Sequence, residues 1–125
     1  MNKVELAQKF SRAEDLIEHI SEELKIDAGE LDWELRNAAK STSLVNVRLF
    51  HSQGGGEGEG SYAIRVFEVS NLKGEVFAYV GRTGFYDSWN GTEWDRWSYM
   101  LGKEVLDYTF EEVSSPVDDI IPLMK

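Results

Sequence analysis

The hydrophobic residues of this chain change their spacing close to Lys40, and this change limits the possible folds more than any other feature. Before Lys40, apolar residues recur every three or four positions, which is typical of a helix with one buried side. From Leu44 onward, apolar and polar residues alternate, which is typical of a strand. Helices followed by a run of strands predict an α+β fold, with the helices packed on one face of an antiparallel sheet.

Two N-terminal helices are expected, over about residues 3–24 and 28–40. The first has a stripe formed by Leu6, Phe10, Ala13, Ile17, Ile20 and Leu24. The second continues the pattern with Leu31, Leu35 and Ala38. Asp27 followed by Glu30 is close to a capping box, which favours a helix start at that point.

The sheet is expected over about residues 44–113, as a four- or five-stranded β-meander. Its predicted strands are Leu44–His51, Ser61–Ser70, Glu75–Arg82 continuing towards Tyr86, Thr92–Tyr99 and Glu104–Val113. The glycine-rich segment Gly54–Gly60 is interpreted as a mobile hairpin loop, because glycine loses much entropy when it is ordered. Residues 114–125 are apolar enough to dock on the body, so residues 1–125 are expected to form a single domain.

The segment from Val76 to Trp97 contains three of the four tryptophans of the chain. At its centre lies Asn90-Gly91, a pair that indicates a tight hairpin because both residues tolerate positive φ. A hairpin tip cannot bury all the rings around it, so we interpret the surplus as a contact surface. Tryptophan, tyrosine and arginine dominate interface hot spots. The candidate partner-binding residues are Tyr86, Asp87, Trp89, Glu93, Trp94, Asp95 and Arg96.

The net charge of −10 bears on the class of partner. Binding to nucleic acid through its phosphates needs a basic face, and an anionic membrane surface repels an acidic protein, so neither is expected. The acidic charge favours solubility, or attraction to a basic partner protein. A secondary acidic face is expected on the first helix, at Glu14, Asp15, Glu18 and Glu22.

Neither a metal nor another cofactor is expected. The chain has no cysteine, which excludes disulfides and thiol chemistry and fits a cytoplasmic location. His19 and His51 lie on different elements, without the spacing of metal ligands. Asp87, Asn90 and Glu93 could offer oxygens to calcium, but turns favour the same residue types for backbone reasons.

Catalysis is not expected either. Glu93 and Asp95 form the most site-like carboxylate pair, but a hydrolytic dyad needs a deep cleft that a small meander rarely provides. No Gly-x-Ser-x-Gly motif supports a serine nucleophile. No membrane-spanning apolar run occurs in the sequence.

The sequence therefore predicts a non-enzymatic, acidic protein-binding module that docks on a basic surface of a partner protein. Its most concrete form is an inhibitor that occupies a nucleic-acid-binding cleft, as a phage-encoded anti-defence protein would. An alternative is an immunity protein that neutralises a cationic toxin. A different class is a small-ligand or sugar-binding domain, or a small enzyme, with a pocket between helices and sheet. Self-association into a homo-oligomer stays open.

Overall fold

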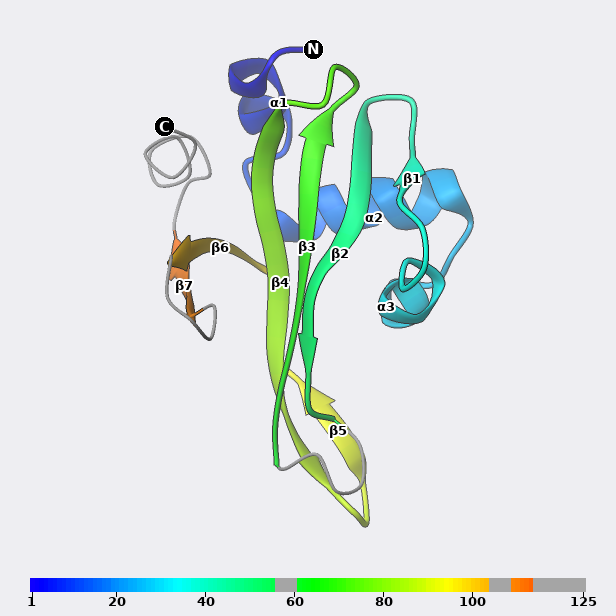
Figure 1. Ribbon diagram of the computed structural model, residues 1–125, viewed down its shortest axis with the longest axis vertical. Helices are drawn as coiled ribbons and strands as arrows, with labels where there is room; N and C mark the ends of the chain where they lie inside the picture. The colour runs from blue at the N-terminus through cyan, green and yellow to red at the C-terminus, as the bar shows by residue number, and fades with distance from the viewer. Residues whose placement is uncertain (56–60, 104–108, 114–125) are drawn as a thin grey trace.

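A computed structural model describes residues 1–55, 61–103 and 109–113, and within them helices precede a sheet (Figure 1). The helices are α1 (Lys3–Lys9), α2 (Ala13–Leu24), the 3-10 helix η1 (Ala28–Glu30) and α3 (Leu31–Glu34). The strands are β1 (Lys40–Ser41), β2 (Val45–Gln53), β3 (Tyr62–Asn71), β4 (Val76–Asp87), β5 (Gly91–Trp94), β6 (Ser98–Lys103) and β7 (Thr109–Val113). The prediction of an α+β fold with an antiparallel meander is confirmed.

The strands of the described residues form a seven-stranded sheet in the order β1-β2-β3-β4-β6-β7, with β5 also paired to β4. β4 therefore has two partners on one edge. Its residues Tyr79–Gly81 pair with β6, and its residues Gly84–Asp87 pair with β5. In Figure 1, β2, β3 and β4 form the long central part of the sheet, with α2 crossing behind its upper half and β5 at its lower end.

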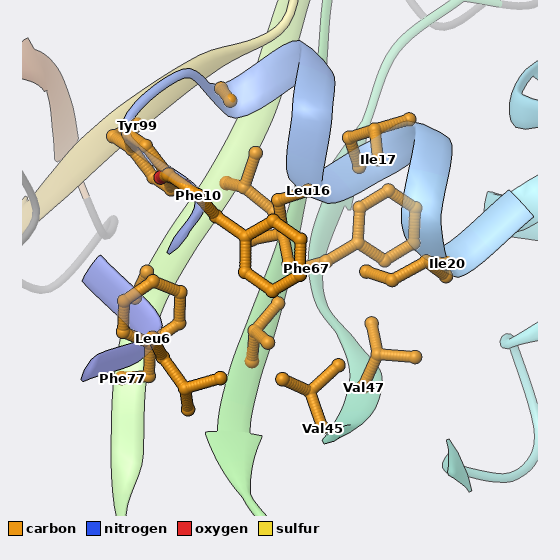
Figure 2. Packing of buried hydrophobic residues seen from close by; sticks show 14 of the residues in the cluster. Leu6, Phe10, Leu16, Ile17, Ile20, Val45, Val47, Phe67, Phe77 and Tyr99 are labelled. Atoms are coloured by element: carbon orange, nitrogen blue, oxygen red, sulfur yellow. The ribbon is translucent and has the colours of Figure 1, made fainter. Parts of the chain in front are cut away.

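The main core lies between the helices and one face of these three strands. Strand alternation sends Val47, Phe67 and Val80 to that face, and all three are almost fully buried. The buried sides of α1 and α2 meet them there (Figure 2). The residues that contribute from this N-terminal segment are Leu6, Phe10, Ala13, Leu16, Ile17 and Ile20, of which Phe10 caps the end of α1. A smaller cluster of Ile64, Val66 and Met100 is buried separately.

The predicted helix over residues 3–24 is divided into α1 and α2 in the structure. α1 starts at a capping box, in which Asn2 Oδ1 accepts a hydrogen bond of 2.8 Å from the Glu5 N–H. The chain leaves the helix at Phe10, whose carbonyl accepts a hydrogen bond from the Tyr99 hydroxyl. The apolar residues of α1 and α2 belong to one core cluster, so the apolar stripe in the sequence continues across the break.

The predicted helix over residues 28–40 is wrong beyond Glu34. Only η1 and the single turn of α3 are helical, and they bury Leu31 and Leu35. Ala38 is exposed, and the chain is already a strand at Lys40, which pairs with Val47 of β2. Without a buried third position, the segment lacks the packing that holds a longer helix.

The predicted strand over residues 92–99 is also divided, because Asp95–Trp97 separate β5 from β6. Residues 101–103, which lie between the last two predicted strands, belong to β6, and β7 covers the end of the last predicted strand. Residues 104–108 and the predicted docked tail 114–125 lie outside the described residues. Of the glycine-rich segment, Gly54 and Gly55 are described, and their carbonyls accept hydrogen bonds from Arg65 and Thr92.

No helix in the described ranges has both the length and the apolar character that crossing a membrane requires.

Candidate functional site

The hairpin tip between β4 and β5 is fixed by Asp87. Its Oδ1 accepts hydrogen bonds of 2.8 Å from the N–H groups of both Trp89 and Asn90. These bonds stabilise the ionised carboxylate, so they hold the pKa of Asp87 below its ordinary value. Asp87 pairs with Gly91, and Gly91 alone of the Asn90-Gly91 pair has positive φ, at 74°. The connection is therefore a loop of the three residues 88–90 followed by the left-handed Gly91, and Asn90 does not take the positive φ that the Asn-Gly pair suggested.

Trp89 projects from this loop and is 92% exposed. Two more exposed rings, Tyr62 at 62% and Phe85 at 59%, lie opposite each other on β3 and β4. Cross-strand partners share a face of the sheet, so these two rings and Glu93, which pairs with Phe85 on β5, form one row. Strand alternation would have identified Tyr62 and Phe85 as outward-facing, but the sequence analysis did not select them.

The other predicted tip residues do not join this row. Trp94 pairs with Gly84, one position away from Phe85, and therefore lies on the opposite, helix-facing side of the sheet. Tyr86 is half-buried, and its N–H donates to the carbonyl of Ser61. Asp95 accepts a hydrogen bond of 3.0 Å from the Thr83 hydroxyl. Arg96 is exposed in the segment between β5 and β6.

The predicted acidic face lies on α2. Asp15, Glu18 and Glu22 are exposed there, and Glu14 is half-buried with its carboxylate 3.7 Å from Arg12. This face lies away from the core, because the apolar side of α2 packs against the sheet. Its charge is therefore available to attract a basic molecule.

A cluster that the sequence analysis missed lies on the helix-facing side of the sheet. We call it the arginine–tryptophan cluster. Three of the six arginines of the chain stack here on three of its four tryptophans. Its members are Trp33, Arg36, Arg65, Arg82, Trp94 and Trp97.

Trp94 and Trp97 hold the centre of this cluster. The Cζ atom of Arg82 lies 4.5 Å from the ring centroid of each of these tryptophans, and the Cζ atom of Arg65 lies 5.1 Å from that of Trp94. Trp94 can lie there because its partner Gly84 has no side chain: a Cβ on Gly84 would be 2.8 Å from Trp94 Cε3. The ring of Trp97 also contacts the core at Phe67, with centroids 5.9 Å apart.

Arg65 and Arg82 are direct cross-strand partners with different electrostatic surroundings. Arg65 Nε donates to Asp32 of α3 at 2.9 Å, and its Nη atoms donate to the carbonyls of Gln53, Gly54 and Ile64. Arg65 is therefore neutralised and almost fully hydrogen-bonded. The side chain of Arg82 has no hydrogen bond or ion pair within the described chain, and its buried Nε lacks an acceptor. Burial lowers the pKa of Arg82 below its ordinary value, and the charge of Asp32 offsets part of this effect.

A cavity of about 530 Å³ opens beside Arg65. Its other lining residues are Arg36, Leu49, Ser52, Gln53 and Gly54. Arg36 stacks on Trp33, with 4.8 Å between its Cζ atom and the ring centroid, and Trp33 is 63% exposed. Arg65 links this cavity to the stacked rings, since it both lines the cavity and contacts Trp94.

The strand pattern contained a signal for this cluster. Arg65 is in phase with the core residue Phe67, and Arg82 is in phase with Val80, so both arginines had to face the helices. An arginine on a core-facing position is unusual unless it is paired or functional. The stacking on Trp94 was not readable in the same way, because it depends on the register of the β4–β5 hairpin.

Within the described parts of the chain, no group of three or more His, Cys, Asp or Glu residues could hold a metal ion. Comparison of the chain with protein-family models, with curated proteins and with solved structures found no significant match.

Proposed function

We propose that this protein is a non-enzymatic binding module that docks its hairpin tip on a basic surface of a partner protein. The observation that carries the proposal is the 92% exposure of Trp89 on a loop whose backbone is fixed by Asp87. A large ring on a backbone that is already ordered loses only its side-chain freedom when it enters a pocket, so more of its contact energy contributes to affinity.

The charge of the chain supports a basic partner. The net charge is −10, and Asp15, Glu18 and Glu22 are exposed along α2. Such a field accelerates the encounter with a cationic surface and repels acidic proteins. Clefts that bind nucleic acid are cationic because they neutralise phosphates. The most specific form of the proposal is therefore an inhibitor that occupies such a cleft, as a phage-encoded anti-defence protein would.

Affinity capture from a lysate of the source organism tests the proposal, with wild type, Trp89→Ala and Leu72→Ala immobilised in parallel. Leu72 is the matched control, because it is an exposed apolar residue in the turn at the other end of β4. We expect a basic protein to be retained by wild type and Leu72→Ala, lost from Trp89→Ala and weakened by salt. A cationic protein such as lysozyme, added as a second control, reports attraction by net charge alone.

The captured protein, once purified, separates the two forms of the function. For a cleft inhibitor, nucleic acid and this protein compete for the partner, so saturation with one prevents binding of the other. For an immunity protein, the partner is a toxin whose activity is blocked. Equal retention of every basic protein by wild type and Trp89→Ala would contradict docking through the tip.

A further inference from the structure

The Arg82 side chain carries a cation that forms no ion pair within the described residues. It lies opposite Arg65 in the β3–β4 ladder, and both arginines contact Trp94. The nearby carboxylate of Asp32 already bonds Arg65 Nε at 2.9 Å. Asp32 and Asp27 therefore act on Arg82 only through space, and the half-buried guanidinium has no carboxylate bonded to it within the described chain.

The indole rings limit how Arg82 can interact. Its Cζ atom lies over the rings of Trp94 and Trp97, 4.5 Å from each centroid, so the two indoles restrict the space around the guanidinium. The N–H groups of a guanidinium donate within its plane, in a fork that matches the two oxygens of a carboxylate or phosphate. The buried Arg82 Nε has no acceptor in the described chain, so hydrogen-bonding capacity is left over.

The adjoining cavity offers room and a further cation. It has a volume of about 530 Å³ and is lined by Arg36, which supplies the charge, and by Arg65, whose charge Asp32 already neutralises. Ser52 and Gln53 add polar groups, and Leu49 adds an apolar wall. Concave sites of this size with a few convergent polar groups are typical of small-ligand binding.

From these contacts we propose that the arginine–tryptophan cluster is a binding site for the oxyanion of a small ligand, a carboxylate or a phosphate. Arg82 is its principal contact, held in place by Trp94 and Trp97. Arg36 is a second cation, which lines the adjoining cavity together with Arg65, the cross-strand partner of Arg82. Attraction of an anion to this site opposes the net charge of −10, so the local charge of Arg82 and Arg36 must supply the selectivity. The site lies on the face of the sheet opposite Phe85 and Glu93, and it includes Trp94 of the β4–β5 hairpin.

Titration with inorganic phosphate and, separately, with acetate tests this site at constant ionic strength set with chloride. The readout is the arginine Nε–Hε NMR signals, with Arg82 assigned through its own side-chain carbons. We expect one of the two anions to shift the Arg82 signal in a saturable manner. Saturation by phosphate identifies a phosphate-bearing ligand, and saturation by acetate identifies a carboxylate ligand.

Variants give the specificity of the response. Arg82→Lys keeps the charge but loses the fork, and we expect it to weaken anion binding by about tenfold or more. Arg48→Lys is the matched control, since Arg48 is bonded to Glu68 by two hydrogen bonds, and binding should be unchanged. Asp32→Asn removes the carboxylate that acts on both Arg65 and Arg82, and we expect it to tighten anion binding. A variant that merely disrupted the structure would weaken binding instead.

If Arg82→Lys fails to fold, the wild-type titration and the Asp32→Asn response still decide the matter. The site is supported if an anion shifts the Arg82 signal in a saturable manner and if it binds more tightly to Asp32→Asn than to wild type. The absence of a saturable shift with both anions, or equal weakening by Arg48→Lys, would overturn the proposal and leave the stacked rings as a packing arrangement.

Discussion

The hydroxyl of Tyr99 on β6 donates a hydrogen bond to the backbone carbonyl of Phe10, which lies at the break between α1 and α2. The two residues are 89 positions apart in the sequence. The bond satisfies a carbonyl that a continuous helix would have bonded internally. Burial, together with the charge of Asp15, raises the pKa of Tyr99 well above its ordinary value, so the hydroxyl keeps its proton.

Replacement of Tyr99 by phenylalanine should lower the free energy of unfolding by about 1–3 kcal/mol, because it leaves the buried Phe10 carbonyl without a donor. Urea denaturation measures this change. Tyr62→Phe is the control, since Tyr62 is exposed, and it should change stability by no more than about 0.5 kcal/mol. Equal effects of the two substitutions would show that the bond does not hold the break.

Trp89 and Trp97 should respond oppositely to truncation. Trp97→Ala removes a ring that packs on Phe67 and stacks with Arg82, so it should destabilise the fold by about 3 kcal/mol or more. Trp89→Ala should leave stability nearly unchanged and weaken binding to the basic partner by about 2 kcal/mol. Denaturant melts and titration of the partner measure the two effects. Unfolding by Trp89→Ala would contradict the contact role of the tip.

The stability of the fold should fall as the pH is lowered from 7.5 to 5, and His19 should cause part of this fall. Burial is the main reason that the pKa of His19 is lowered from 6.5, while Glu23 and Glu22 oppose that effect and Lys9 adds to it. The unfolded state then binds a proton more readily than the folded state. Stability contributed by His19 is therefore present above pH 6.5 and is lost as the pH falls towards the lower, folded-state value.

Thermal melts of wild type and His19→Gln across this pH range measure the contribution. The Nε2 atom of His19 lies 2.9 Å from the Thr42 hydroxyl, and glutamine can keep a hydrogen bond there without titrating near neutral pH. We expect the variant to have a flatter dependence of Tm on pH. Parallel curves for the two proteins would assign the whole pH effect to other groups.

Asp87→Ala should loosen the tip without unfolding the body. The substitution removes the acceptor of the Trp89 and Asn90 N–H groups, so both amides should exchange with solvent faster. Hydrogen exchange followed by NMR measures this effect. Glu93→Ala is the control on the neighbouring strand, and it should leave those two amides unchanged. Unchanged exchange in Asp87→Ala would show that Gly91 alone holds the loop.

The fold class was predictable from the change in hydrophobic period, since that change reports which faces are buried. The break at Phe10 was not predictable, because Leu6 and Ile17 bury the same side in either case. A long-range hydrogen bond from Tyr99 reaches the break, and such contacts leave no periodic signal. α3 was overestimated because Ala38 fits a helical stripe by identity but is exposed in the structure.

The exposure of Trp89 followed from its place beside the turn, whereas the grouping of the tip residues did not. Phe85 and Trp94 lie on opposite faces because β4 and β5 pair in a register that the sequence does not state. The same register brings Trp94 over Gly84 and onto Arg82. Alternation in β3 and β4 could have placed Arg65 and Arg82 on the core side, but their stacking partners required the structure.

β4 pairs with β6 along one part of its edge and with β5 along the next part, and this arrangement limits where the chain can accept insertions. An insertion inside β4 would invert every side chain beyond it, and would carry Gly84 away from Trp94. An insertion among residues 88–90 would leave both ladders in register. The loop of residues 88–90 can therefore be replaced by another loop, in evolution or by grafting, while β4 keeps a fixed length.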